Sequence, residues 1–379
     1  MKRFRRPPLI GAAALTAALC ASWVTSSPAL AHSNVTVVAS GLDNPRDLAF
    51  TPSGKLYVAQ AGHGGSECIP SPDPGAGSTC VGFTSSISRI EPSGAVVPVV
   101  TGFVSTAGTD GTAATGVDGI ATLGDTIYGI ETGTQDVLPD GPNPFLSPQT
   151  VATARAQLGR LIEAHPSGLW AAVADVGHFD FQWTGARPDL VPGQFPDANP
   201  YGVYATRGVQ WVVDAAANTL DKVLPNGIVS VVAFFPNPPA SDAVPTCIDR
   251  GPDGAFYVGE LTGGGNAPGA SVVWRVAPGN DPVAWATGLT AVTGCGFGRN
   301  GQFYAVEFST LGLDNAAPNT GAVVRVPPHS DSPVVGDDDL SFPGGFAAGP
   351  GNTLYVSNWS IMPAENHGGP TGQVVRIIP

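Results

Sequence analysis

One position in a recurring sequence pattern carries polar or acidic side chains. Each copy ends a short apolar run such as Phe-Tyr-Val-Gly-Glu, and the six end residues are Gln60, Glu131, Asp214, Glu260, Glu307 and Asn358. Grouped carboxylates raise one another's pKa values or recruit a cation, and Ca²⁺ prefers oxygen ligands. The four acidic members, Glu131, Asp214, Glu260 and Glu307, are therefore candidate metal ligands, with Ca²⁺ as the one cofactor the sequence suggests. The alternative is that these side chains accept hydrogen bonds from loop backbones.

A second set of polar residues lies at the starts of the innermost strands, the first apolar run of each repeat. If the runs surround an axis, such residues converge at one end of a channel, where they can orient a ligand. For Arg46, Asp47 and Asp118 the alternative is a salt bridge between the first two repeats. The candidate ligand-binding residues are Arg46, Asp47, Asp118, Tyr201, Asp249, Arg250 and, in the loop after Gln60, His63.

Residues for covalent or general-base catalysis are scarce. The chain has six histidines, and a hydrolase or lyase commonly uses one as its general base. It contains no Gly-x-Ser-x-Gly segment, no His-Glu-x-x-His segment and no phosphate-binding Walker loop. The sequence therefore names no catalytic residue.

The elements that must position these residues are short strands in six repeats. The second strand of a repeat reads Leu-Tyr-Val-Ala-Gln at 56–60 and Phe-Tyr-Val-Gly-Glu at 256–260, and turns such as Thr51-Pro52-Ser53-Gly54 precede it. A third strand such as Val-Trp-Arg-Val at 273–276 follows, and then a fourth. Six repeats of four antiparallel strands predict an all-β fold, the six-bladed β-propeller.

The two ends of the chain and two insertions depart from this rhythm. The last repeat stops after its third strand, whereas Val35–Val38 forms a strand with no repeat of its own. We therefore expect the N-terminal strand to complete the last blade. The insertion at 134–157 contains a helix candidate at Val151–Gln157, opened by Ser147 and Pro148, and the insertion at 170–200 shows no clear period.

Composition and the N-terminal segment bear on location and partners. Residues 1–31 combine basic residues, an apolar stretch and Ala29-Leu30-Ala31, which predicts a secretory signal peptide followed by a propeller domain at 32–379. No later stretch is long and apolar enough to span a membrane. The net charge of −13 gives no basic patch for nucleic acid. We expect a secreted monomer.

Four cysteines follow the predicted signal peptide, and an even number in an exported protein favours disulfides. Cys68 and Cys80 would close a loop rich in Pro, Gly and Ser. Cys247 and Cys295 lie at nearly the same height in neighbouring repeats, so a bridge between blades is plausible, with paired free thiols as the alternative.

Several segments resemble the ScyD/ScyE family of exported proteins across essentially the whole mature chain. They include Gly41–Phe50, Asp214–Leu220 and Gly259–Gly263. The resemblance implies a six-bladed propeller of the NHL-like type. The family is associated with making the pigment scytonemin outside the cytoplasm.

Two function classes follow from these features. The first is a propeller that binds a small molecule, glycan or peptide at the mouth of its channel. The alternative is a propeller enzyme, either a metal-assisted lactonase or lyase or a catalyst that couples an aromatic metabolite oxidatively. Binding is the interpretation that the sequence favours, because it names polar groups near the axis but no catalytic residue.

Overall fold

The repeated apolar runs form strands because β-branched and aromatic residues alternate with turns built on Pro and Gly. In the turn after the first innermost strand, the amide of Gly54 donates to the carbonyl of Thr51 over 2.9 Å, and Gly54 has φ 85°. The turn at 251–254 repeats this geometry, with Gly254 at φ 80°. A computed structural model describes residues 34–71, 77–138, 140–236, 242–263, 267–327, 334–365 and 369–379. The predicted signal peptide lies outside the described residues.

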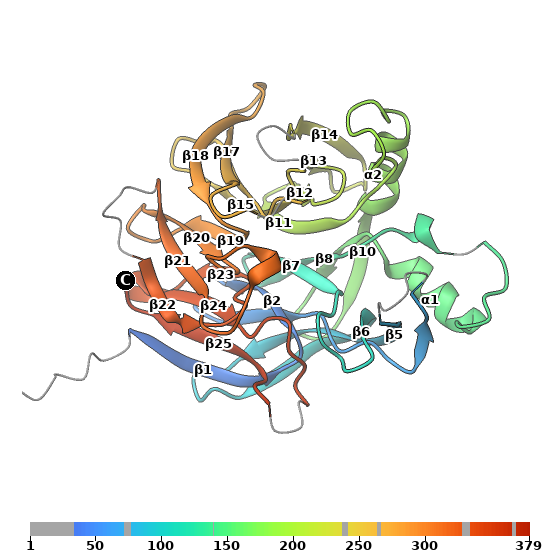
Figure 1. Cartoon of the computed structure of the whole chain (residues 1–379), viewed down its shortest axis with the longest axis horizontal. Helices are drawn as coiled ribbons and strands as arrows, with labels where there is room; N and C mark the ends of the chain where they lie inside the picture. Colours follow the sequence, from blue (N-terminus) through green and yellow to red (C-terminus); the bar gives the residue numbers. More distant parts are fainter. Residues whose placement is uncertain are drawn as a thin grey trace, which may run out of the picture. The chain divides into compact units, whose positions relative to one another are not determined.

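Six antiparallel blades, each built on four strands, surround a common axis, as predicted, and β4 adds a fifth strand to blade one (Figure 1). The innermost strands are β2 (Pro45–Phe50), β7 (Val117–Leu123), β11 (Pro200–Thr206), β15 (Pro245–Arg250), β19 (Val292–Phe297) and β23 (Phe346–Ala348). The second strands are β3 (Leu56–Gln60), β8 (Thr126–Glu131), β12 (Val209–Asp214), β16 (Phe256–Glu260), β20 (Phe303–Glu307) and β24 (Leu354–Asn358). The third strands are β5 (Thr79–Ile90), β9 (Arg160–Ala164), β13 (Thr219–Val223), β17 (Ser271–Val276), β21 (Gly321–Val326) and β25 (Gly372–Ile377). The outermost strands are β6 (Val96–Gly108), β10 (Trp170–Asp175), β14 (Val229–Phe234), β18 (Val283–Leu289), β22 (Val334–Leu340) and β1 (Val35–Leu42).

The N-terminal strand closes the ring, which confirms the expectation from the sequence. Strand β1 pairs antiparallel with β25, the third strand of blade six. At the end of this ladder the Asn34 side-chain amide donates to the Ile378 carbonyl, and the Ile378 amide donates to the Asn34 carbonyl. Blade six is therefore assembled from both ends of the described chain.

Short helical elements lie outside the blades. Helix α1 (Pro148–Gln157) begins at the predicted place, because the Ser147 hydroxyl accepts the amide hydrogen of Thr150. Helix α2 (Val176–Gly185) was not predicted. It follows β10 directly, is capped by Asp175, and contains Gly and β-branched residues that are poor helix formers. Three single turns of 3₁₀ helix are η1 (Gln135–Val137), η2 (Leu313–Asn315) and η3 (Pro350–Asn352).

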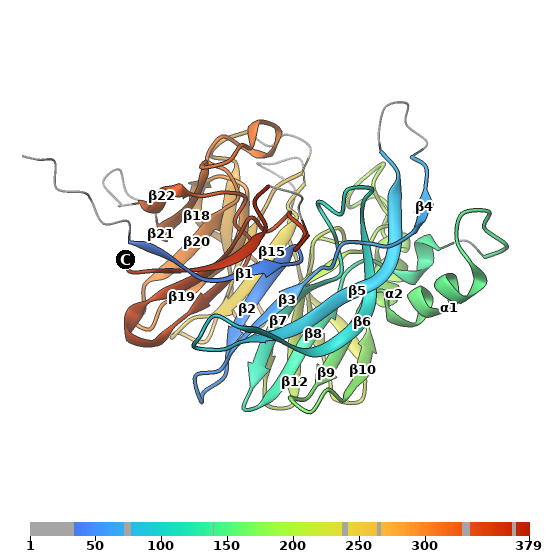
Figure 2. The same ribbon diagram turned by 90° about the horizontal axis from the view of Figure 1, so that it is seen from below.

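Blade one carries an extension that holds α1. Strands β5 and β6 continue beyond the blade, and the short strand β4 (Glu67–Ile69) pairs with the start of β5 (Figure 2). The predicted Cys68–Cys80 disulfide joins directly paired residues of β4 and β5. Buried apolar residues of the extension and of α1 form a small separate core. The Glu67 carboxylate accepts from the Ser147 amide, so the extension also fixes the start of α1.

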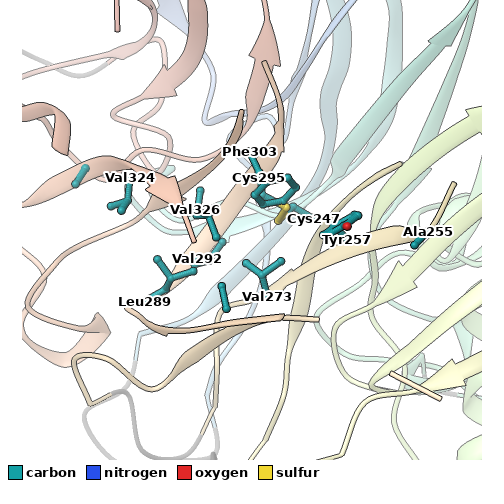
Figure 3. Packing of buried hydrophobic residues seen from close by; sticks show 13 residues of the cluster. Cys247, Ala255, Tyr257, Val273, Leu289, Val292, Cys295, Phe303, Val324 and Val326 are labelled. Carbon is teal, nitrogen blue, oxygen red and sulfur yellow. A yellow bond between two sulfur atoms is a disulfide. The ribbon is translucent and has the colours of Figure 1, made fainter. Parts of the chain in front are cut away.

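The core lies between neighbouring blades. Between blades four and five, Tyr257, Phe303 and Val273 belong to one buried cluster (Figure 3). The second predicted disulfide, Cys247–Cys295, lies in this cluster and joins β15 to β19 with Cα atoms 5.6 Å apart. The innermost strands of adjacent blades are thus close enough for the bridge that the sequence left open.

Candidate functional site

A cavity of about 310 Å³ lies on the axis of the ring. Innermost strands of all six blades line it. Their ladders leave one edge of each strand without a strand partner, so backbone N–H and C=O groups face the axis and need other partners. This arrangement makes the axis the place where six repeats present different side chains to one ligand-sized space.

A β-bulge at the start of the innermost strands turns polar side chains to the cavity. In blade two, Val117 pairs with Glu131 and Gly119 pairs with Ile130, so the ladder skips Asp118. Blades three to five show the same shift, and blade one skips both Arg46 and Asp47. Such a bulge re-aims the extra residue. The skipped residues that line the cavity are Arg46, Asp47, Asp118, Tyr201, Thr246 and Thr293.

Arg46 and Asp118 form an ion pair between blades one and two, with the Nε and Oδ1 atoms 3.3 Å apart. Thr132 donates its hydroxyl hydrogen to the other carboxylate oxygen over 2.8 Å. Burial acts to lower the pKa of Arg46, but Asp118 and Tyr201 outweigh it and raise the value. Burial raises the pKa of Tyr201 to about 12, so the phenol keeps its proton. The salt bridge considered from the sequence is present, and it forms part of the cavity wall.

The Asp47 carboxylate accepts hydrogen bonds from backbone amides on the unpaired edges of the innermost strands. It accepts from its own neighbour Leu48 over 2.8 Å and from Ile120 of blade two over 3.2 Å, and the amide of Phe346 in blade six also donates to it. Burial, opposed by these donors, raises the pKa of Asp47 to about 7, and Asp249 adds to the rise. One carboxyl group thus links three blades at the cavity.

Asp249 of blade four makes contacts of the same kind, two positions further along its strand than Asp47. It accepts from the amides of Phe297 in blade five and of Arg250, each over 2.7 Å. Burial raises its pKa to about 6. Because blades one and four are opposite each other in a six-bladed ring, Asp47 and Asp249 interact across the cavity. Two carboxyl groups that titrate near neutral pH can accept hydrogen bonds from a ligand or exchange protons with it.

Two predicted ligand-binding residues do not line this cavity. Arg250 is the last residue of β15, at the opposite end of the strand from Thr246, and its guanidinium donates to the Gly254 carbonyl. His63 is half exposed and its Nδ1 lies 2.8 Å from a carboxylate oxygen of Asp43. Sequence reasoning placed Arg250 at the strand start because it did not foresee that β15 continues through this residue.

The cavity also includes residues that the sequence analysis missed. Towards the ends of the innermost strands, its wall contains Phe50, Tyr204, Phe297 and the exposed Arg299. The repeats carried only a partial signal, since β2 and β19 end in phenylalanine and the other innermost strands do not end in an aromatic residue. The cavity therefore has a polar end, where the strands begin, and a more aromatic end.

The structure does not group the four carboxylates predicted to bind a metal. Glu260 accepts from the amide of Val272 over 3.1 Å and from the Trp274 indole over 2.5 Å, and Glu307 accepts from the amide of Thr290 over 2.8 Å. Burial raises the pKa of Glu260 to about 8 and that of Glu307 to about 7. Among the described residues, no group of three or more His, Cys, Asp or Glu side chains is arranged to hold a metal ion. The contact of Glu307 fits the loop-capping alternative, whereas the partners of Glu260 lie in strand β17.

The other two members of that set are buried for different reasons. Glu131 accepts no hydrogen bond from the described residues, and burial followed by the charge of Asp118 raises its pKa well above the ordinary value. Asp214 caps the backbone with one oxygen, which accepts from the amides of Asn199, Ala216 and Ala217 over 2.7 to 2.9 Å. Its second oxygen faces the carboxyl group of Asp180, a residue that lies outside the repeat pattern.

Three fully buried aspartates, Asp180, Asp214 and Asp221, contact one another where α2 covers blade three. Neither Asp180 oxygen accepts from an N–H or O–H donor among the described residues, and the carboxyl groups of Asp214 and Asp221 lie close enough to share a proton with it. Burial, then the charges of Asp221 and Asp214, raises the pKa of Asp180 well above its ordinary value. Burial also raises the pKa of Asp214 to about 6 and that of Asp221 to about 7. Hydrogen bonds between carboxyl groups require protons, so this cluster holds α2 through shared protons.

Comparisons with known proteins identify the fold but no family. No family model matches the chain, and no curated protein sequence matches it. A Bacteroides thetaiotaomicron protein of unknown function superposes with a TM-score of 0.54 at 10% identity, covering 90% of this chain and 74% of that one. A candidate oxidoreductase (glucose dehydrogenase) from Thermus thermophilus gives 0.53 at 14% identity, over 91% and 99% of the two chains. A candidate gluconolactonase gives 0.50 at 13% identity, over 92% of each chain. At this identity the likeness shows a shared six-bladed propeller fold.

Proposed function

We propose that this protein is an exported propeller that binds a small polar molecule in its axial cavity. The observation that carries the proposal is the convergence of Arg46, Asp47, Asp118, Tyr201 and Asp249 on one cavity from four different blades. These side chains come from bulged or edge positions of rigid strands. A site of this kind is pre-organised, so a ligand would lose little affinity to ordering of the protein.

The chemistry of the cavity favours a ligand with several hydroxyl or other hydrogen-bond donor groups. Asp47 and Asp249 are acceptors on opposite sides, and Tyr201 supplies a phenol that remains protonated. The Arg46 charge is already matched by Asp118, so an anionic ligand would gain little from it. The names of the structural neighbours, a glucose dehydrogenase and a gluconolactonase, support sugars and sugar lactones as the first compounds to test.

Export is part of the proposal. The N-terminal 31 residues have the composition of a signal peptide, and two disulfides suit an oxidising compartment. No helix among the described residues is long and apolar enough to cross a membrane. The resemblance to the ScyD/ScyE family supports the same location, and it makes aromatic secondary metabolites a further ligand class for the more aromatic end of the cavity.

The test is a thermal-shift panel on residues 32–379 with aldoses, aldonolactones, aromatic metabolites and divalent cations. We expect at least one polyhydroxylated compound to raise the melting temperature in a concentration-dependent way. The rise should be lost in Asp249→Asn and kept in Asp281→Asn, which changes an exposed turn of the same blade. If no compound shifts the melting temperature, or if the shift persists in Asp249→Asn, the proposed site is wrong.

A second candidate function, an enzyme, rests on the pKa values of Asp47 and Asp249. Carboxyl groups that titrate at about 7 and about 6 on opposite sides of a cavity are suited to act as general acid and general base. Opening of a lactone by water would need this pair and no redox cofactor. The discriminating experiment is to incubate any bound lactone with wild type and Asp47→Asn. Turnover by the wild type alone would favour the enzyme, and a stable stoichiometric complex would favour binding.

A further inference from the structure

A second cavity lies between blades two and three and shares no lining residue with the axial cavity. Its volume is about 420 Å³, within the range of roughly 300 to 1,000 Å³ that small-ligand pockets occupy. Strands β8, β9 and β10 supply one side, and the turns at Gly208 and Pro225 of blade three supply the other. We call it the lateral cavity.

Polar groups of the lateral cavity centre on one carboxylate. The Tyr128 hydroxyl donates to Oε2 of Glu163 over 3.1 Å, and Nε2 of His165 lies 3.5 Å from Oε1. Burial, followed by the Glu163 charge, raises the pKa of Tyr128 to about 12, so this phenol remains a donor. The Glu163 side chain is 38% exposed. Each carboxylate oxygen has two lone pairs, so Glu163 retains acceptor capacity for a ligand after bonding Tyr128.

The apolar wall of the lateral cavity is a tryptophan that packing holds in place. Trp170 of β10 is 39% exposed, although its ring centre lies 4.9 Å from that of the buried Phe103. Leu169 beside it is 72% exposed. The exposed part of this indole presents an apolar surface of fixed orientation to the cavity, and a ligand with an apolar face would remove that surface from water.

These observations together select the kind of ligand. A purely apolar or aromatic compound would cover Trp170 but would bury Glu163 and His165 without partners. A simple cation would pair with Glu163 but would make no contact with the apolar face of Trp170. A pyranose ring has one face of C–H groups and an edge of hydroxyl donors, so it can satisfy both the wall and the carboxylate. We propose that the lateral cavity is a saccharide-binding site, with Trp170 as the platform and Glu163 as the acceptor of paired hydroxyl groups.

The experiment is saturation-transfer NMR and titration calorimetry of residues 32–379 with methyl pyranosides and disaccharides. We expect transfer to the ring C–H protons, and we expect Trp170→Ala and Glu163→Gln each to weaken binding about tenfold or more. Two controls should bind as the wild type does: Trp183→Ala, which changes a tryptophan on α2, and Asp281→Asn, which changes an exposed connection in blade four. Circular dichroism would verify that each variant is folded.

Three results would overturn the inference. The first is that no saccharide shows saturation transfer, and the second is that Trp170→Ala and Glu163→Gln bind as the wild type does. The third is loss of saccharide binding in Asp249→Asn alone, which would assign the ligand to the axial cavity instead. Because the two cavities share no residue, failure of this inference leaves the axial proposal standing, and the reverse also holds.

Discussion

Replacement of Asp221 by Asn should make folding less sensitive to pH. The Asp221 carboxyl is fully buried, and burial raises its pKa to about 7, compared with an ordinary value of 3.8. Between pH 5 and pH 7 the folded protein therefore holds a proton that the unfolded chain has released. Stability falls as pH rises through this window, by about 1.4 kcal/mol per pH unit and per proton. Over two units the loss assigned to Asp221 is about 2 kcal/mol, because half of the folded molecules have released this proton at pH 7.

The assay is guanidinium unfolding of residues 32–379 at pH 5, 6 and 7. The wild type should lose about 2 kcal/mol more than Asp221→Asn between pH 5 and pH 7, since Asn cannot titrate and also removes a charge beside Asp180. Buried acids outside the cluster, such as Glu260, titrate in both proteins, so their contributions to the pH dependence cancel when the two proteins are compared. The control is Asp125→Asn, which changes an exposed carboxylate paired with Lys55. Equal pH dependence of wild type and Asp221→Asn would refute the shared-proton account of the cluster.

Three further predictions concern the ring itself. Deleting residues 34–42 removes β1 and its ladder with β25, so unfolding should lose cooperativity in calorimetry; an unchanged transition would contradict ring closure. Replacing Cys247 and Cys295 by Ala should lower the free energy of unfolding by about 2 to 4 kcal/mol, measured with denaturant, and no change would show that the bridge adds nothing. In Gly345→Ala the new methyl group would lie 2.3 Å from the Cα atom of Asp47, so strands β2 and β23 must separate. This should cost about 1 to 3 kcal/mol, and an unchanged melting temperature would argue against the close approach.

The architecture was predictable because its evidence is repeated. Six copies of a strand pattern, with turns such as 51–54, indicate a propeller even where single copies are weak. The missing fourth strand of the last repeat identified β1 as its completion. The helix at Pro148–Gln157 was accessible because Ser147 and Pro148 are strong start signals. Each of these features depends on local chemistry or on counting strands.

The details of the aspartate cluster and of the axial cavity depend on contacts between residues far apart in the sequence, which no local pattern encodes. Asp180 lies in an insertion, so aligning the repeats could not bring it to Asp214 and Asp221. The bulges that direct Asp118 and Tyr201 to the axis shift the ladder by one residue without changing the strand composition. Arg250 was assigned to the cavity for a different reason, because the boundaries of a short strand are the least certain part of a sequence-based prediction and β15 extends through this residue. The carboxylates at the ends of the second strands recur as expected, but only Asp214 and Glu307 accept from loop amides.

The central claim is that the axial cavity binds a small polar molecule through Asp47 and Asp249. The most direct measurement is titration calorimetry of the strongest thermal-shift ligand with wild type, Asp249→Asn and Asp281→Asn. The account predicts one-to-one binding by wild type and Asp281→Asn, and a dissociation constant at least about tenfold higher for Asp249→Asn, the loss expected for a hydrogen bond to a charged group. Equal affinity in all three proteins would contradict the claim.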